Sequence, residues 1–292
     1  IIIGPVDYTF VNDLKQFNDL VFLSLSNMSS IIEKNVIMMG INLESQLLSI
    51  KNFIDKQEKK KTVILYPDSK ESQHIGKKIK QIGFNNSRVF KYSNESEVLT
   101  GQIEKLTNYK QRKINLESRV KKLEKSELPK DVRELNELKQ KYTLGNVNFD
   151  SVIIIDFGNN LKSVLTSLVY TDVNQDKVLF TTVNQWFDES IFYENTIKTI
   201  YYPSVNYKEF KRYNNNYFKK FNKYPNEITI LTYDALGLIY YVWKKNGSLN
   251  SVNDFSFKNK IKGKIGTFSF KDKKVTQELE IYKTENNKFI KY

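Results

Sequence analysis

The residues of this sequence that could bind a small molecule are polar and aromatic side chains that directly follow predicted strands. In open α/β sheets, ligands bind in the crevice at the carboxyl ends of the strands. Hydroxyl, amide and carboxylate groups beside an aromatic wall suit an amino acid or a sugar, whose polar groups need partners once water is removed. The candidate ligand-binding residues are Asp7, Tyr8, Ser24, Ser26, Asn27, Asp156, Phe157, Gly158, Asn184 and Trp186. The polar ones have an alternative interpretation as turn residues or helix N-caps.

The sequence lacks the residue combinations that most catalytic and metal sites require. It contains no cysteine, which excludes disulfides, thiolate zinc sites, iron–sulfur clusters and cysteine nucleophiles. A single histidine, His74, excludes multi-histidine metal sites. None of the patterns G-x-G-x-x-G, G-x-x-x-x-G-K-S/T and G-x-S-x-G occurs. We therefore expect no catalytic residues, no metal and no cofactor, and a protein that is not an enzyme.

The net charge of +13 raises the question of a nucleic-acid partner. Only five of the 46 basic residues are arginine, the residue that nucleic-acid and phosphate sites favour for its bidentate geometry. Lysine is enriched together with Asn, Ile, Phe and Tyr, which is typical of AT-rich coding sequence. We expect no nucleic-acid partner, and a functional basic surface is the alternative interpretation.

The elements that must position the candidate residues alternate between strands and helices. Continuous apolar strands between amphipathic helices favour parallel sheets covered on both faces, so the fold class is α/β. Strands are expected at residues 1–3, 20–25, 62–66, 88–92, 152–155 and 178–182. Helices are expected at residues 6–17, 43–56, 72–82, 161–168, 207–222 and 228–245. Antiparallel strands are expected at residues 265–270, 275–283 and 288–292.

Residues 97–142 interrupt this alternation. They are rich in Lys, Glu and Leu, and two apolar stripes at helical spacing are separated by a turn with Pro129 and an expected N-cap at Asp131. The pattern predicts a helical hairpin that projects from one lobe, because an ordinary connection between two strands is much shorter. It is either a solvated decoration or an arm that docks a partner.

The chain begins with Ile1-Ile2-Ile3-Gly4-Pro5, a strand followed by a turn, and has no initiator methionine. We therefore expect that the natural N-terminus lies upstream, together with any targeting signal. No stretch approaches the ~18 consecutive apolar residues of a membrane helix.

Several motifs resemble one family. The segments Ile2-Ile3-Gly4-Pro5 and Leu23-Ser24-Leu25-Ser26-Asn27 resemble early motifs of type I periplasmic binding proteins, the leucine/isoleucine/valine-binding class. Thr232-Tyr233-Asp234-Ala235-Leu236 and the stretch from Gly263 to Phe270 are similar to late motifs of that class. A subgroup, the penicillin-binding protein activators of the LppC type, is similar at Leu106-Thr107-Asn108-Tyr109, Phe149-Asp150-Ser151-Val152 and Trp186-Phe187-Asp188. The resemblance covers essentially the whole chain.

This resemblance implies two Rossmann-like lobes with a ligand cleft between them and a helical-hairpin insertion in the second lobe. The implied divisions are residues 1–42 for the remainder of lobe 1, 43–202 for lobe 2 with its insertion at 97–142, 203–250 for helices returning to lobe 1, and 251–292 for strands that cross back to lobe 2. About two βα units of lobe 1, a signal peptide and any lipidated cysteine would be absent from this chain. Ligand positions would fall on Ser24, Ser26 and Asn27, on residues 156–158 and on residues 184–186.

Two functions follow from the resemblance. The first is a non-enzymatic envelope protein, periplasmic and with a lipid anchor in the missing segment as its membrane attachment, that activates peptidoglycan synthesis by binding a penicillin-binding protein. The second is the soluble receptor of an ABC transporter, which would bind an amino acid or similar solute and an ABC permease. The position expected to be acidic in amino-acid receptors lies near Asn184, which favours the activator.

Overall fold

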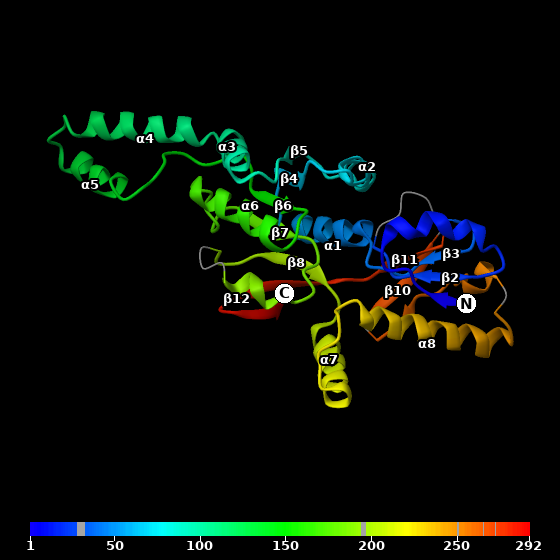
Figure 1. Cartoon of the computed structure of the whole chain (residues 1–292). Coiled ribbons are helices and arrows are strands. Elements are labelled where there is room, and N and C mark those ends of the chain that lie inside the picture. Colours follow the sequence, from blue (N-terminus) through cyan, green and yellow to red (C-terminus); the bar gives the residue numbers. More distant parts are fainter. Residues whose placement is uncertain (28–32, 194–196, 250, 265, 272) are drawn as a thin grey trace.

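The computed structural model describes residues 1–27, 33–193, 197–249, 251–264, 266–271 and 273–292, which form two α/β lobes, each built on its own sheet (Figure 1). Both sheets are mostly parallel, and a helical arm extends from the end of the molecule opposite to the N-terminus. The predicted class, α/β with two parallel-sheet lobes and a helical insertion in the second, is confirmed.

Lobe 1 contains a six-stranded sheet with helices on both faces. Along β2 and β3, alternate residues face opposite sides, as the strand period requires. Phe22 and Met38 pack against the 3-10 helix η1, whereas Leu23 and Ile37 face the α8 side. The strand order is β1(Ile2–Ile3), β2(Phe22–Ser24), β3(Val36–Met38), β11(Lys274–Gln277), β10(Thr267–Lys271) and β9(Ile261–Lys262), and the helices are η1(Tyr8–Gln16), α8(Thr229–Asn246) and η3(Val252–Phe255).

Lobe 2 contains a seven-stranded sheet whose centre is buried on both sides. Ile64 and Ile153 pack with α1 and α2, whereas Val63, Val152 and Ile154 pack with α3 and α6, so the apolar runs of β4 and β6 are continuous. The strand order is β13(Lys288–Lys291), β12(Glu280–Glu285), β8(Tyr201–Ser204), β7(Leu179–Thr182), β6(Ser151–Ile154), β4(Thr62–Pro67) and β5(Ser87–Tyr92). The helices are α1(Leu43–Lys56), α2(Ser72–Ile82), α3(Ser96–Leu106), α6(Gly158–Tyr170) and η2(Glu189–Tyr193).

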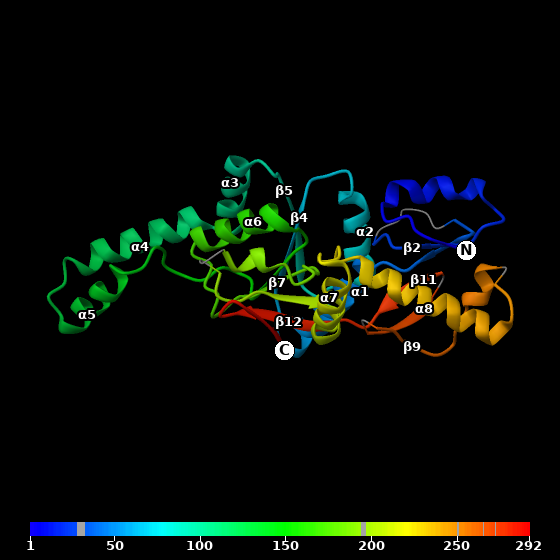
Figure 2. The ribbon, with the colours of Figure 1, turned by 60° about the horizontal axis from the view of Figure 1, so that its bottom comes forward.

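The chain crosses between the lobes three times: after β3, after β8 and between β11 and β12. At the first crossing Gly40 passes very close to the end of β2. A Cβ atom at this position would lie 1.9 Å from the carbonyl oxygen of Ser26, so only glycine fits. Figure 2 shows the crossing segments between the two lobes.

One strand prediction was wrong in detail, and one strand was not predicted. The expected strand at residues 275–283 is two strands, because β11 pairs with β3 in lobe 1 and β12 pairs with β8 in lobe 2, with Glu278 and Leu279 between them. The crossing carries no proline or glycine, so the sequence pattern reads as one strand. The short strand β3 was not predicted, although all three of its residues are buried.

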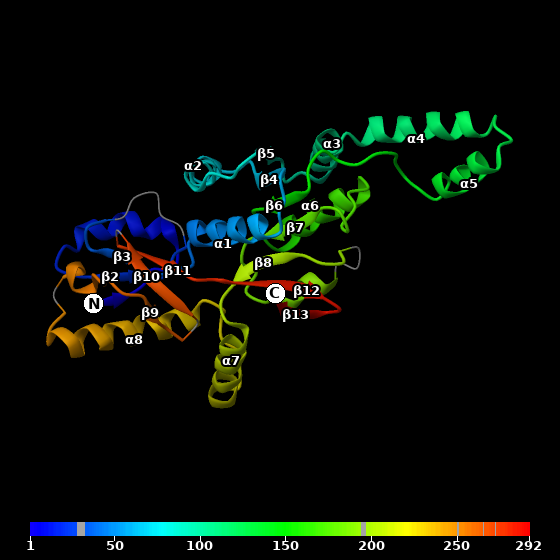
Figure 3. The ribbon, with the colours of Figure 1, turned by 180° about the vertical axis from the view of Figure 1, so that it is seen from behind.

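The helical segment also differs from its prediction. It forms three helices rather than a hairpin, because α3 is followed by α4(Tyr109–Leu123) and α5(Pro129–Leu138). Leu99 and Ile103 of α3 lie in the lobe 2 core, so only α4 and α5 project from it (Figures 1 and 3). Leu128 rather than Asp131 is the N-cap of α5, because Pro129 occupies its first turn and fits there without an N–H group. We call α4 and α5, residues 109–138, the arm.

The two lobes share a hydrophobic core. One buried cluster combines Leu23 and Ile37 from the lobe 1 sheet with Tyr202 and Tyr282 from the lobe 2 sheet. Phe187 lies among aromatic rings of this cluster, with centroid distances of 4.6 Å to Tyr207 and 5.0 Å to Tyr282. Helix α7(Tyr207–Phe221) contributes Phe210 to the cluster and then extends away from both sheets (Figures 1 and 3).

Two of the family-like motifs contact each other. The carboxylate of Asp234 on α8 accepts a hydrogen bond of 2.5 Å from the backbone N–H of Lys264. A Cβ atom at Gly263 would lie 2.5 Å from the same carboxylate. The close contact of Asp234 with Gly263 and Lys264 therefore packs α8 against the segment between β9 and β10.

Within the described residues, no helix is long and apolar enough to cross a membrane.

Candidate functional site

A cavity of about 230 Å³ lies between the lobes, at the carboxyl ends of strands from both sheets. Leu25 and Asn27 follow β2, Ile41 follows β3, and Phe157 and Asn184 follow β6 and β7. The full lining is Val6, Leu25, Asn27, Ile41, Gln46, Phe157, Asn184, Trp186, Ile228 and Leu231. The cavity is thus an apolar chamber with three amide side chains.

Asn184 is a buried polar residue of this cavity with several hydrogen-bond partners. It is 4% exposed, and its Oδ1 accepts hydrogen bonds from the Trp186 backbone N–H (3.0 Å) and the Ser204 hydroxyl (2.8 Å). Its own backbone N–H donates to Oε1 of Gln46 (2.9 Å), whose Nε2 donates to the Ile41 carbonyl (3.0 Å). No described residue accepts a hydrogen bond from Nδ2 of Asn184, so this donor is free to meet a ligand.

The turn after β7 holds two aromatic residues in an unusual conformation. Trp186 and Phe187 have φ values of 51° and 60°, in the left-handed region that non-glycine residues rarely adopt. The hydrogen bond from Trp186 N–H to Asn184 Oδ1 stabilises this turn. As a result Trp186 borders the interlobe cavity, while Phe187 points into the shared core. Rare backbone conformations of this kind persist where the surrounding packing holds them, and they are often found at functional sites.

Four of the ten residues expected from the sequence line this cavity: Asn27, Phe157, Asn184 and Trp186. Asp7 instead accepts the Thr9 N–H bond that caps η1, and Gly158 begins α6. Tyr8 begins η1, and its side chain lies outside the described part of the structure. That the four lining residues bind a ligand stays a prediction.

Ser24 and Ser26 have internal roles. Ser24 is fully buried, and its hydroxyl donates to the Pro5 carbonyl (3.0 Å) and accepts from the Ser26 N–H (3.2 Å). These bonds fix the end of β2 beside the Gly40 crossing. The two serines therefore shape the cavity wall without lining the cavity.

Asp156 is buried next to the cavity rather than in it. Its carboxylate accepts hydrogen bonds from the Tyr92 hydroxyl (2.5 Å) and the Phe157 backbone N–H (2.8 Å). Burial raises the pKa of this carboxyl above its ordinary value, although the hydrogen bonds oppose the shift. Burial and the nearby carboxylate raise the pKa of the Tyr92 hydroxyl well above its ordinary value. The hydrogen bond between Tyr92 and Asp156 therefore links the ends of β5 and β6.

Sequence reasoning missed Gln46 and the apolar walls of the cavity. Gln46 lies in the first turn of α1, where it could as well face solvent, and nothing in its neighbours distinguishes the two. Ile228 and Leu231 come from the start of α8, which reaches the cavity from a distant part of the chain. Val6, which also lines the cavity, directly precedes Asp7 and Tyr8 in the sequence.

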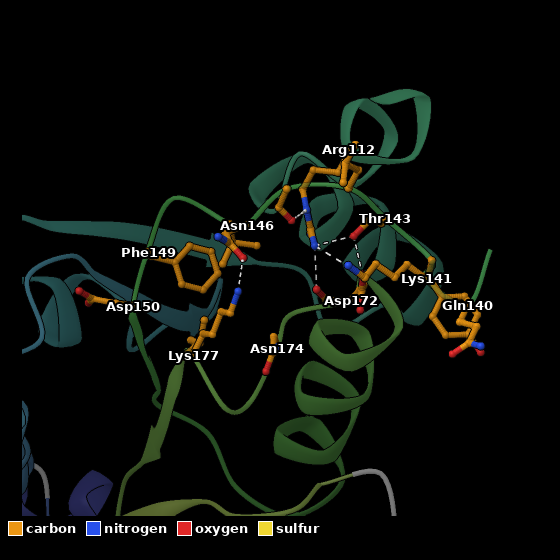
Figure 4. A pocket seen from close by; sticks show the side chains of 15 residues that line it. Arg112, Gln140, Lys141, Thr143, Asn146, Phe149, Asp150, Asp172, Asn174 and Lys177 are labelled. Carbon is orange, nitrogen blue, oxygen red and sulfur yellow. Dashed lines mark hydrogen bonds and ion pairs between the residues drawn. The ribbon is translucent and has the colours of Figure 1, made fainter. Parts of the chain in front are cut away.

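A larger open cavity, about 750 Å³, lies at the base of the arm (Figure 4). Arg112, one of the cations that line it, is only 6% exposed. It donates to the carbonyls of Gly145 (3.2 Å), Thr171 (3.0 Å) and Asp172 (2.8 Å) and to the Thr143 hydroxyl (2.7 Å). Arg112 therefore fastens α4 to the end of α6, with four of its five N–H donors used inside the protein.

The single histidine, His74, lies near lysine side chains. Burial lowers the pKa of His74, and the charges of Lys78 and Lys274 lower it further. Among the described residues, no group of three or more histidine, aspartate or glutamate side chains is arranged to hold a metal ion. The described lining of the interlobe cavity offers a ligand apolar contacts and amide hydrogen bonds.

Several solved structures with similar folds are binding or regulatory proteins. The chain is similar to a branched-chain amino acid ABC transporter periplasmic ligand-binding protein from Burkholderia xenovorans LB400, with a TM-score of 0.68, 8% identity and coverage of 100% of this chain and 75% of that one. It is similar to full-length LpoA from Haemophilus influenzae, with a TM-score of 0.60, 10% identity and coverage of 99% and 47%. It is also similar to the C-domain of that LpoA, a regulator of PBP1A, with a TM-score of 0.55, 12% identity and coverage of 99% and 81%.

These identities establish the fold alone. The chain spans about half the length, 47%, of full-length LpoA and of an extracellular ligand-binding receptor from Desulfohalobium retbaense. No protein-family model matches the chain, and no curated protein matches it.

Proposed function

We propose that this chain, which has the fold of the type I periplasmic binding proteins, is a non-enzymatic protein of the bacterial envelope that activates a penicillin-binding protein by direct contact. LpoA, a regulator of PBP1A, has a similar fold and supports this assignment. The observation that carries the proposal is the arm, which extends from lobe 2 and contributes nothing to the cores of the two lobes.

The arm is a self-supporting unit. Leu116, Leu123 and Leu138 form a separate buried cluster between α4 and α5. Arg119 donates two hydrogen bonds to the Glu134 carboxylate, of 2.8 and 2.6 Å, and so joins the two helices in bidentate geometry. Because the arm is internally packed and held at its base, it presents a defined surface. Binding to such a surface costs less conformational entropy than binding to a flexible loop.

The outer surface of the arm carries unpartnered apolar side chains. Leu128 and Val132, at its far end, are 64% and 42% exposed, and Ile114 is 52% exposed. Exposed apolar groups of this kind on a rigid projection, rimmed by charged residues, suit a protein partner. We assign the end of the arm, around Leu128 and Val132, as the docking site for the penicillin-binding protein.

Replacing residues 115–138 with a short Gly/Ser linker tests this assignment. The replacement keeps Arg112, so the base of the arm stays latched. We expect the lobes to fold with a small loss of stability, because the entropy of loop closure changes slowly with length, by about 0.6 kcal/mol per doubling. Binding to the purified penicillin-binding protein, and stimulation of its glycan polymerisation, should be lost. Unchanged stimulation would remove the arm from the proposal, and absence of stimulation by the unmodified protein would overturn the function itself.

A point variant provides a milder test. Leu128→Ser with Val132→Ser should weaken partner binding at least tenfold, since central apolar contacts dominate most interfaces. Leu48→Ser, at another exposed leucine far from the arm, is the matched control and should bind normally.

The interlobe cavity favours a second candidate function, a soluble receptor that binds a small solute and delivers it to an ABC permease. None of the described residues that line the cavity is charged. A zwitterionic amino acid would leave its carboxylate and ammonium groups without ionic partners, at a high desolvation cost. The ligand of such a receptor would therefore be neutral, with an apolar body and one acceptor placed against the Asn184 amide.

A thermal-shift screen separates the two candidates. A neutral ligand present at 100 times its Kd should stabilise the protein by about 2.7 kcal/mol. Fluorescence of Trp186 should change on binding, and the Trp186→Phe variant should lose that change while Trp243 remains. Stabilisation by charged amino acids, but by no neutral solute, would contradict the ligand class.

A further inference from the structure

We propose that the outer end of α7 docks on an anionic lipid bilayer. Helix α7 and its following turn form an amphipathic projection that neither lobe covers, because Phe210 is the only buried residue of the helix. Figures 1 and 3 show α7 extending away from both sheets, with its C-terminal end outermost. We call residues 217–224 at this end the α7 tip.

The α7 tip exposes a cluster of aromatic rings. Phe218, Phe221 and Tyr224 are 38%, 51% and 66% exposed. Phe218 stacks on Tyr224 with a centroid distance of 4.7 Å, and Tyr217 lies 4.5 Å from Phe221. Single exposed apolar residues are ordinary on protein surfaces, but four adjacent rings at the end of a projection form a patch that needs a partner.

Lysines surround these rings, and the α7 tip itself contains no aspartate or glutamate. From residue 210 to residue 226 the sequence has five basic residues and no aspartate or glutamate. Lys219, Lys220 and Lys223 are exposed and form no ion pair with a described residue, and Lys220 lies 5.6 Å from the Phe221 ring centroid. Cations near a helix C-terminus interact favourably with its dipole, but the dipole does not account for the exposed rings.

The combination of rings and lysines matches an anionic membrane interface. Aromatic rings occupy the headgroup region of bilayers, and lysines beside them are attracted to anionic lipids. A narrow convex tip buries little area against a rigid protein surface, whereas it can sink into a fluid interface. A symmetric contact with a second copy would place two basic tips face to face, which like-charge repulsion opposes.

Sedimentation with lipid vesicles tests the proposal. The whole protein should bind vesicles of phosphatidylethanolamine and phosphatidylglycerol, bind vesicles of phosphatidylcholine much more weakly, and dissociate as salt is raised. Because each lysine near an anionic surface contributes about fivefold to binding, Lys219→Gln with Lys220→Gln and Lys223→Gln should weaken it about a hundredfold. Phe218→Ser with Phe221→Ser and Tyr224→Ser should weaken it at least tenfold.

The matched control removes three lysines from the arm: Lys121→Gln with Lys122→Gln and Lys125→Gln. All three are exposed, so the loss of charge is equal and the fold is not disturbed. Vesicle binding that survives this control but not the α7 variants supports the proposal. An equal loss of vesicle binding in the arm control and in the α7 lysine variant would overturn it. So would unchanged binding of the aromatic variant, or no vesicle binding by the unmodified protein. A dimer in solution that only the α7 variants disrupt would also overturn it, in favour of a second copy.

Discussion

At the scale of single residues, Gly40 controls how the chain leaves lobe 1. Its backbone lies against the carbonyl of Ser26, and a Cβ atom there would overlap that oxygen. Gly40→Ala should therefore lower the free energy of unfolding by at least about 2 kcal/mol, because the clash is with backbone that cannot rotate away. Urea denaturation measures the change.

Gly101 is the matched control for this substitution. It lies within α3, and a Cβ atom there would meet nothing within 4 Å. Gly101→Ala should leave the protein as stable or more stable by about 0.5–1 kcal/mol, since glycine is a poor helix former. Equal effects of the two substitutions would mean that Gly40 is not constrained by the crossing.

Asp156 makes the stability of lobe 2 depend on pH. Burial raises the pKa of its carboxyl in the folded state, so the folded protein holds this proton to higher pH than the unfolded chain does. The contribution of this group to stability therefore falls as the pH rises from about 4, the ordinary aspartate value, through the raised folded-state pKa.

Asp156→Asn removes the ionisation and can keep a hydrogen bond with Tyr92. As the pH rises across this range, the variant should become progressively more stable relative to the unmodified protein, as measured by the free energy of unfolding. Urea denaturation at a series of pH values from 4 to neutrality measures it, and a constant difference would contradict the raised pKa.

The candidate site could be predicted only where sequence adjacency determines position. Residues that follow a strand lie at its carboxyl end, and this rule led to Asn184 and Trp186, which line the cavity. The same pattern could not distinguish a side chain that faces the cavity from one that completes a hydrogen bond behind it, as Ser24 and Asp156 do. That choice depends on partners far along the chain, such as Tyr92 and Pro5.

At the scale of elements, the latch at Arg112 sets the position of the arm. Arg112→Met would leave the carbonyls of Gly145, Thr171 and Asp172 without their shared donor. We expect a loss of about 2–4 kcal/mol in unfolding free energy, because buried hydrogen bonds to a charged group are costly to break. Hydrogen exchange should accelerate in residues 139–146.

Arg119→Met is the control for the loss of an arginine in the same helix. Its ion pair with Glu134 is partly exposed to solvent, which screens the attraction, so stability should change little. Protection of residues 139–146 should stay as in the unmodified protein. If both variants loosened this segment equally, Arg112 would have no special role.

Helices were easier to predict than the sheet partners of strands. The spacing of apolar residues gave α1 and α2 with their observed bounds, because amphipathic periodicity is a local property. The same periodicity in α3 could not tell whether its apolar face packs on a sheet or on a neighbouring arm helix. For residues 274–285, pairing with strands far back in the chain divides one apparent strand between two sheets.

At the scale of the whole molecule, the shared core couples the lobes. Phe187 contacts rings from β8, α7, β12 and β13 within one cluster that also contains the lobe 1 sheet residues. Phe187→Ala should lower the free energy of unfolding by about 3–5 kcal/mol. The unmodified protein should melt in a single calorimetric transition, and two separated transitions would contradict a common core.

The third crossing has a consequence for the order of events during synthesis. Lobe 1 receives β11 and lobe 2 receives β12 from one short stretch, and the Asn42 side chain bonds the Val275 carbonyl across 233 residues. Neither sheet can be completed until this stretch has been translated. A nascent chain therefore carries an unfinished edge at β3 for most of its synthesis and a second one at β8 once residue 204 has been made. Both edges close slowly, because the missing partners are remote in the sequence.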